Sequence, residues 1–203
     1  MISVVDYGVA NLASMLNMLR KVGVDAERVG TPEDLESATK IVLPGIGAFD
    51  QGMATLEERG LLDPLRRKVR DEGVPILGVC LGMQMLGQGS EEGHAAGLGL
   101  IDATCRRFRP PEGVALKVPH MGWNTVLPRR SSPLLDGLDE QSRFYFVHSY
   151  HVVCREPADE LACSRYGNAF TSIVAHGNIY GVQFHPEKSH RFGMALLRNF
   201  ANL

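Results

Sequence analysis

The sequence predicts an α/β protein in which a central, mostly parallel sheet is flanked by helices and extended by antiparallel strands in the second half. Three observations predict this. Strand-like and helix-like runs alternate over residues 1–80 with short connections, which implies right-handed crossovers and a doubly wound sheet. Pro75–Val79 is apolar throughout, as in a parallel strand covered on both faces. After residue 100 short strand-like runs follow one another, which favours antiparallel pairing.

The first elements have clear boundaries. Ile2–Val5 is a β-branched run, and apolar residues then recur at helical spacing over Leu12–Val22. Gly23 follows as a C′ residue that ends the helix. Asp25–Val29 predicts the second strand. Thr31 then predicts a helix start, since a proline and two acidic residues come directly after it.

The remaining elements of the first half continue the alternation. They are a strand over Lys40–Leu43 closed by the turn segment 44–47, helices over Phe49–Glu58 and Leu61–Glu72 that end at Gly60 and Gly73, the strand Pro75–Val79, and a helix over Leu81–Leu86. This order predicts four parallel strands with helices between them.

The second half predicts mainly strands. The expected strands are Ala103–Phe108, Val114–Val118, Arg143–Tyr150, His151–Cys154, Leu161–Tyr166, Thr171–Ala175 and Ile179–Phe184, and a helix over Arg191–Asn199 closes the chain. The chain has 203 residues and shows no repeat, low-complexity tract or linker. We therefore expect a single domain over residues 1–203.

Composition excludes several function classes. The formal charge is −2, which disfavours nucleic acid or an anionic membrane as the main partner. No apolar run approaches the ~18 residues of a membrane span, and the first residues do not resemble a signal peptide. The four cysteines fit neither a zinc motif nor a disulfide framework. We expect a cytoplasmic protein with reduced thiols, no metal and no cofactor.

The sharpest local signal is Gly78-Val79-Cys80-Leu81-Gly82, which lies between the apolar strand and a helix. G-x-C-x-G is the thiol version of the nucleophile elbow, a tight turn that projects a nucleophile above the sheet. The helix N-terminus beneath the sulfur favours the thiolate. A buried cysteine between two packing glycines is the structural alternative.

A cysteine nucleophile needs a base, and His185-Pro186-Glu187 follows the last strand-like run. In extended backbone, residues two apart point to the same side, so Glu187 can reach the His185 imidazole and fix its tautomer. Cys80, His185 and Glu187 therefore form a candidate triad. Taken alone, His-Pro-Glu can also be an ordinary polar turn.

The two motifs together resemble the triad-type, class I glutamine amidotransferases. More narrowly, the chain is similar to the glutaminase subunits of imidazole glycerol phosphate synthases in histidine biosynthesis. The matching motifs cover essentially the whole chain: Asp6-Tyr7-Gly8 with Asn11-Leu12, Leu43-Pro44-Gly45-Ile46-Gly47-Ala48-Phe49, the elbow with Met83-Gln84, Ser90-Glu91-Glu92-Gly93, Gly97-Leu98-Gly99-Leu100, Pro119-His120-Met121-Gly122-Trp123-Asn124, Tyr145-Phe146-Val147-His148-Ser149-Tyr150 and Gln183-Phe184-His185-Pro186-Glu187-Lys188-Ser189.

The resemblance implies roles for these residues. Cys80 would attack the side-chain amide of glutamine to give a thioester, with His185 as the acid and base and Glu187 orienting it. The Leu81 amide would supply one oxyanion donor, and the loop of Gly45, Ile46 and Gly47 would supply the other. Gln84 and Glu92 would help to hold the substrate, with Glu92 on its α-ammonium group. The backbone of His148, Ser149 and Tyr150 would bind the amino-acid head.

The resemblance also implies a partner, the barrel-shaped cyclase subunit of imidazole glycerol phosphate synthase, in a heterodimer that channels ammonia. The residues expected at the interface or on the ammonia path are Asn11, Met121, Trp123, Tyr145 and Lys188. Two alternatives stay open. The same glutaminase chemistry could feed another synthase, for example one that amidates a sugar for surface polysaccharide, or the chain could be a free-standing γ-glutamyl thiol hydrolase.

Overall fold

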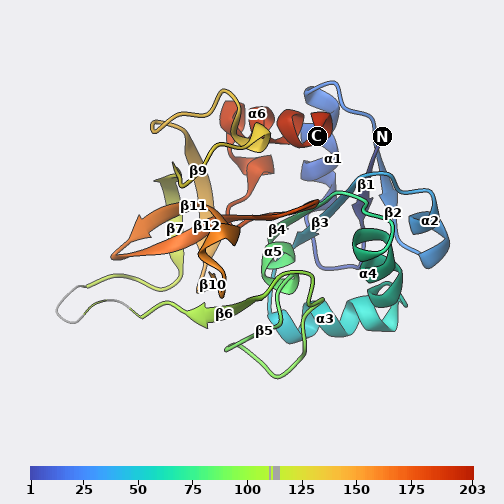
Figure 1. Cartoon of the computed structure of the whole chain (residues 1–203), viewed down its shortest axis with the longest axis horizontal. Helices are drawn as coiled ribbons and strands as arrows, with labels where there is room; N and C mark the ends of the chain where they lie inside the picture. The colour runs from blue at the N-terminus through green and yellow to red at the C-terminus, as the bar shows by residue number, and fades with distance from the viewer. Residues whose placement is uncertain (110, 112–114) are drawn as a thin grey trace.

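The apolar β-branched runs of the first half form the parallel part of a central sheet. The computed structural model describes residues 1–109, 111 and 115–203 (Figure 1). Its parallel strands lie in the order β2 (Ala26–Val29), β1 (Ile2–Val5), β3 (Ile41–Gly45), β4 (Ile76–Cys80) and β13 (Ile179–Val182). The strand order reverses beside β1, so the sheet is doubly wound as predicted.

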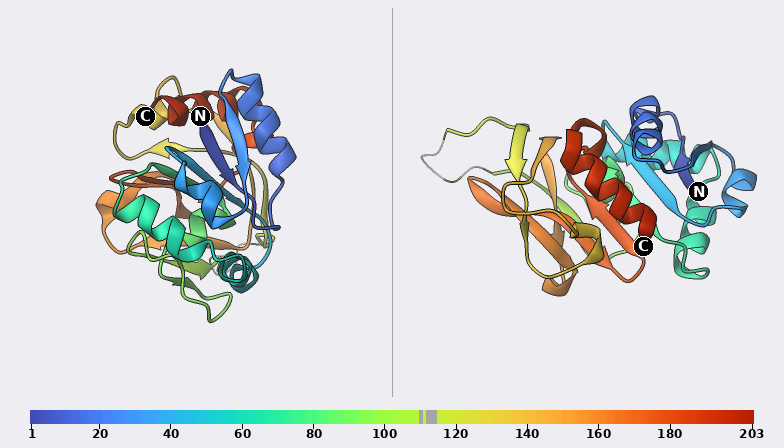
Figure 2. Two further views of the ribbon diagram at one scale, coloured as in Figure 1. Left: turned by 90° about the vertical axis from the view of Figure 1, so that its right-hand side faces the viewer. Right: turned by 90° about the horizontal axis from the view of Figure 1, so that it is seen from above.

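Helices cover both faces of this parallel region, as Figures 1 and 2 show. One face carries α1 (Leu12–Lys21) and α6 (His190–Asn202), and the other carries α2 (Pro32–Glu36), α3 (Phe49–Glu58), α4 (Leu62–Arg70) and the short α5 (Leu81–Met85). Two apolar clusters fill the interfaces, with Met15 and Leu196 in one and Phe49 and Leu65 in the other. The parallel strands are therefore buried on both sides, which explains their unbroken apolar runs.

The antiparallel half joins the parallel half at β13, which pairs in parallel with β4 and antiparallel with β12 (Asn168–His176). The sheet continues through β10 (Tyr150–Cys154) and β6 (Ala103–Arg107) to β5 (Gly89–Ser90), while β11 (Glu160–Tyr166) pairs with β12 and β8 (Leu127–Pro128). A separate two-stranded sheet forms from β7 (His120–Thr125) and β9 (Arg143–His148). A parallel sheet extended by antiparallel strands is the architecture that the sequence predicts.

One strand prediction is wrong. Residues 115–118 of the expected strand Val114–Val118 have no regular secondary structure, and Val114 lies outside the described residues. The strand forms instead at β7, which begins directly after Pro119. Proline has no N–H to donate to a strand ladder, so regular pairing starts only at the next residue. The short β5 and β8 were also not predicted. The last predicted strand ends at Val182 rather than at Phe184.

The predicted helix signals match the structure. Gly23 has φ +77° directly after the C-cap residue of α1, and its N–H donates to the Arg20 carbonyl. Thr31 and Asp34 form a reciprocal capping box at the start of α2. Within the described ranges, no helix is both long and apolar enough to cross a membrane.

Candidate active site

Cys80 stands at the turn between β4 and α5, where the chain reverses from strand to helix within one residue. Its φ is 55° and its ψ is −108°, a conformation that an L-residue with a side chain rarely adopts. Such strain persists only where the surrounding structure imposes it, and it is concentrated at functional sites. The strand-to-helix geometry and the strained residue together are those of a nucleophile elbow.

The glycines of the motif permit this turn because backbone passes close to both of them. A Cβ on Gly82 would lie 1.8 Å from the Leu43 carbonyl oxygen, and a Cβ on Gly78 would lie 2.7 Å from the Gly82 carbonyl carbon. Both contacts are with backbone atoms, so no side chain can move aside to relieve them. The elbow is thus packed against the backbone of β3.

We expect Gly82→Ala to lower the free energy of unfolding by about 2–4 kcal/mol, because the added methyl group displaces the Leu43 backbone. Urea unfolding measures this loss. Gly89→Ala is the matched control, since its Cβ would meet nothing closer than 3.6 Å, and it should change stability by less than about 1 kcal/mol. Equal stability of the two variants would contradict the close packing of the elbow.

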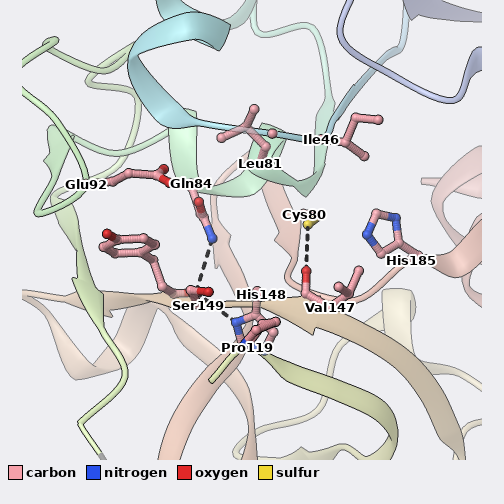
Figure 3. A pocket seen from close by; sticks show the side chains of 12 residues that line it. Ile46, Cys80, Leu81, Gln84, Glu92, Pro119, Val147, His148, Ser149 and His185 are labelled. Atoms are coloured by element: carbon pink, nitrogen blue, oxygen red, sulfur yellow. Dashed lines mark hydrogen bonds between the residues drawn. The ribbon is translucent and has the colours of Figure 1, made fainter. Parts of the chain in front are cut away.

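His185 and Glu187 form a buried pair beside Cys80. The His185 Nδ1 lies 2.8 Å from the Glu187 Oε1, and their side chains are 2% and 5% exposed. Since a carboxylate oxygen can only accept, Nδ1 carries a hydrogen and Nε2 is left for the sulfur. Among the described residues, Nε2 has no hydrogen-bond partner. The pair therefore presents an unoccupied imidazole nitrogen toward the elbow cysteine (Figure 3).

Three effects set the pKa of His185. Burial lowers it, but the Cys80 sulfur and the Glu187 carboxylate raise it by more, to about 10. This favours an imidazolium beside the sulfur at neutral pH. An imidazolium in this position can protonate a leaving amine and then, as the neutral base, activate a water molecule.

These groups line a cavity of about 300 Å³, a volume suited to a small molecule such as an amino acid. Figure 3 shows Cys80 and His185 at one end and Glu92 at the other, with Gln84 and Leu81 between them. The wall opposite Leu81 comes from the segment that joins β9 to β10 and includes His148 and Ser149. The cavity therefore places a candidate nucleophile and a carboxylate at opposite ends.

The candidate oxyanion donors come from two places, the start of α5 and the loop that follows β3. The Leu81 amide stands at the first position of α5, where no intrahelical acceptor exists. In contrast, the Ile46 amide donates to the Val9 carbonyl oxygen at 3.0 Å. The Ile46 N–H lies in the peptide unit that joins Gly45 to Ile46, and Gly47 follows with φ +93°, so glycines on both sides of Ile46 permit a change of backbone conformation here. Only one of the two donors is available in this conformation.

The residues expected to bind substrate lie in the cavity wall, but some of their polar groups already have partners. The Gln84 Nε2 donates to the Tyr150 carbonyl at 3.2 Å and to the Gln183 Oε1 at 3.1 Å. The Ser149 carbonyl accepts from the Phe108 amide at 2.9 Å. Gln84 therefore fixes the wall that carries Tyr150, and Glu92 is left as the charged group at the far end.

Two neutral histidines, His148 and His120, form a hydrogen-bonded chain that supports the cavity wall at Tyr150. The His148 Nδ1 lies 2.7 Å from the Tyr150 carbonyl oxygen, so it donates, and its Nε2 accepts from the His120 Nδ1 at 3.0 Å. The His120 Nε2 then accepts from the Asn124 amide at 3.4 Å. Burial lowers the pKa of His120 to about 4 and that of His148 to about 3. His148 therefore acts as a neutral support for the Tyr150 backbone rather than as an acid.

This histidine chain predicts a pH dependence of stability. Unfolded histidines bind protons near pH 6.5, whereas these two do so only near pH 4 and 3 in the folded state. Their contribution is therefore complete above pH 6.5 and is lost as the pH falls below it. We expect His120→Asn, whose amide can still donate to His148, to reduce the slope of unfolding free energy between pH 6 and 4 by about 1.4 kcal/mol per pH unit. Urea unfolding at several pH values measures it, and an unchanged slope would contradict the assignment.

Three of the residues expected at an interface, Met121, Trp123 and Tyr145, lie on one face of the β7–β9 sheet. Met121 and Trp123 are 62% and 47% exposed, and they pair with Val147 and Tyr145 across the two strands. The Lys188 ammonium lies 5.9 Å from the Tyr145 ring centroid. Because side chains alternate along a strand, His120 and Phe146 point to the opposite, buried face. Asn11 lies elsewhere, exposed, where it caps α1 by accepting from the Ser14 amide.

Gln183 makes a contact that the sequence motifs do not assign. It is fully buried, and its Nε2 lies 3.8 Å from the Cys80 sulfur while its Oε1 accepts from Gln84. Gln183 follows the end of β13, and no spacing in the sequence identifies its contact with Cys80, which lies 103 positions away. Gln183 thus connects the nucleophile to the Gln84 wall.

Comparison with known proteins identifies the family. The family model described as glutamine amidotransferase class-I matches residues 3–203. The chain belongs to the class I glutamine amidotransferases. The resemblance predicted from the motifs is therefore confirmed, and the chain is an amidotransferase of this class.

Individual relatives of this amidotransferase are similar over their full lengths. It is 54% identical over 203 residues, all of both chains, to the imidazole glycerol phosphate synthase subunit HisH 2 of Pseudomonas aeruginosa. It is 51% identical over 200 residues, 98% of each chain, to the protein of the same name from Methanococcus maripaludis. A crystal structure of a glutamine amidotransferase is 22% identical with a TM-score of 0.71, over 100% of both chains, and this likeness shows that the two share a fold.

Proposed function

We propose that this amidotransferase hydrolyses glutamine to glutamate and ammonia as the glutaminase subunit of an imidazole glycerol phosphate synthase. The ammonia passes to a cyclase subunit that makes imidazole glycerol phosphate and an aminoimidazole carboxamide ribotide. The observation that carries the proposal is the strained elbow cysteine beside a buried His185–Glu187 pair, at one end of an amino-acid-sized cavity. The full-length similarity to subunits named for this synthase supports the choice of pathway.

The chemistry follows from the geometry. The Cys80 sulfur attacks the side-chain amide carbon of glutamine, and the carbonyl oxygen becomes an oxyanion beside the Leu81 amide. The imidazolium of His185 protonates the nitrogen as the carbon–nitrogen bond breaks, which releases ammonia and leaves a γ-glutamyl thioester. Neutral His185 then removes a proton from water, and the water oxygen attacks the thioester carbon. The carbon–sulfur bond breaks, which releases glutamate and restores the Cys80 thiolate beside the imidazolium. Glu187 keeps the imidazole in the tautomer that both steps need.

The partner in this proposal is a barrel-shaped cyclase that forms a heterodimer with the chain. The exposed apolar side chains of Met121 and Trp123 support an interface on the β7–β9 sheet, because burying apolar surface against a partner is favourable in free energy. Tyr145 and Lys188 would lie at the same interface, beside the ammonia path, and Asn11, at the start of α1, would contact the same partner. In the same proposal residues 1–203 act as one amidotransferase domain in the cytoplasm, where four free cysteines would stay reduced.

The experiment that tests this function mixes the purified chain with the cyclase and the nucleotide substrate of the cyclase. We expect glutamine to support formation of imidazole glycerol phosphate, with one glutamate released for each product molecule. Absence of product with an active cyclase would overturn the choice of partner.

A second partner class is an outcome of the same experiment. Glutaminase chemistry that serves a different, sugar-amidating synthase is the second candidate. It predicts glutamine hydrolysis that responds to that synthase and not to the cyclase. Full hydrolysis without any partner would instead support a free-standing hydrolase.

A further inference from the structure

At the end of the cavity that is remote from Cys80, two segments far apart in the sequence are joined by hydrogen bonds. In each direction, a carboxylate of one segment accepts from backbone amides of the other. The Glu92 Oε2 accepts from the Phe49 amide at 2.8 Å, at the start of α3. In return, the Asp50 carboxylate accepts from the His94 amide at 2.9 Å and from the Ala95 amide at 2.9 Å. We call this set of three bonds the α3 clasp. It attaches the loop that carries Glu92 to the helix that follows the oxyanion loop.

The sequence explains why the clasp forms. The N-cap residue of α3 is Ala48, which has no side chain to accept from the free amides of the first turn. Glu92 supplies the missing acceptor from another part of the chain, and both carboxylates are stabilised by the helix N-terminus. The backbone bonds from His94 and Ala95 also hold the pKa of Asp50 below its usual value.

Gly93 lets the two segments approach. A Cβ on Gly93 would lie 2.0 Å from the Asp50 Oδ1, inside the carboxylate itself. A methyl group at this position would therefore push the Asp50 carboxylate away from the His94 and Ala95 amides. The clasp is a specific contact between these two residues rather than a chance approach of two exposed loops.

Glu92 needs such support because it reaches the cavity from an exposed loop. An exposed glutamate samples many rotamers, and fixing it costs conformational entropy on substrate binding. The clasp holds one carboxylate oxygen on the Phe49 amide and leaves the other for a ligand. At the end of the cavity opposite Cys80, that oxygen suits the α-ammonium group of an amino acid.

We propose that Asp50 is a positioning residue that holds Glu92 where it recognises the α-ammonium group of the substrate. The inference rests on the proposed glutaminase function and deepens it, because it explains how the substrate is selected as an α-amino acid. Asp50 is not among the residues that line the cavity. Its effect is therefore on substrate binding rather than on the chemical step.

The test measures glutamine hydrolysis by the chain in complex with its cyclase partner and nucleotide. Asp50→Asn keeps the shape of the side chain but replaces one acceptor with an NH₂ group. We expect the KM for glutamine to rise about tenfold, as for the loss of one charge-assisted hydrogen bond, with kcat changed by less than about twofold. Gly93→Ala breaks the clasp from the other side and should give the same result. Asp63→Asn, whose side chain is 92% exposed, is the control and should match the wild type.

A second substrate separates positioning from general loosening. Glutaramate is glutamine without its α-amino group, so Glu92 cannot recognise it. We expect Asp50→Asn and Gly93→Ala to leave kcat/KM for glutaramate unchanged, so that the preference for glutamine over glutaramate falls about tenfold. An equal loss on both substrates, or an unchanged KM for glutamine, would overturn the proposal for Asp50. A wild-type complex that fails to hydrolyse glutamine would instead overturn the proposed function and this inference with it.

Discussion

Cys80→Ala is expected to lower the rate of glutamine hydrolysis by at least ~10⁴-fold, because it removes the nucleophile and no other thiol of the described residues stands in an elbow. Without the sulfur no thioester can form, and the His185–Glu187 pair has only water to activate. Ammonia release by the partner-bound enzyme measures the loss. Substantial turnover by pure, folded variant would contradict the assignment of Cys80.

Covalent labelling of the cysteines tests the same assignment of Cys80 as the nucleophile. An electrophilic glutamine analogue should modify Cys80 and spare Cys105, Cys154 and Cys163, as peptide mapping can establish. Burial raises the pKa of Cys105 and of Cys154 to about 12, which leaves almost no reactive thiolate on either at neutral pH. Cys154→Ser is the control variant and should keep full hydrolysis. Labelling of any cysteine other than Cys80 at a comparable rate would contradict this assignment.

The partner is expected to accelerate glutamine hydrolysis by about 10²–10³-fold, the usual effect of one oxyanion donor. In this structure the Ile46 amide donates to the Val9 carbonyl, so it is not available to an oxyanion. A change of backbone conformation, which the glycines on both sides of Ile46 permit, would aim a second amide at the cavity. We infer that the isolated chain is nearly inactive for this reason.

The measurement compares glutamate formation by the isolated chain, by the chain with the cyclase, and by the complex with nucleotide substrate. A stepwise rise in kcat, with little change in KM, fits the repositioning of a transition-state donor. Full turnover by the isolated chain would contradict the role given to Ile46 and would favour a free-standing hydrolase.

The first half of the fold could be predicted because local signals and tertiary structure agree there. Apolar strands, the capping box at Thr31 and the glycine after α1 each specify their own element without reference to distant residues. The strand β7 was missed for the opposite reason. It contains a glycine and exposes Met121 and Trp123, so its sequence lacks the alternation expected of a strand with one apolar face inward.

The same distinction applies to the site. His185 and Glu187 are two residues apart, so their hydrogen bond is a local contact that the sequence predicts. It forms across the 3-10 helix Pro186–Lys188 rather than along the extended backbone that the prediction assumed. The contacts between Gln183 and Cys80, between His120 and His148, and between Asp50 and His94 join residues that are 103, 28 and 44 positions apart. Each depends on how strands and loops meet in space. No spacing rule in a single sequence reports such contacts.

The most direct test of the central claim, that Cys80 only generates ammonia for a partner, uses the Cys80→Ala chain in complex with the cyclase. The complex receives the nucleotide substrate with either glutamine or a high concentration of ammonium salt at alkaline pH, where free ammonia is available. We expect product from ammonium at the rate of the wild-type complex and no product from glutamine. If the folded and assembled variant cannot use ammonium, then Cys80 takes part in the synthase step or the partner is wrong, and the central claim is contradicted.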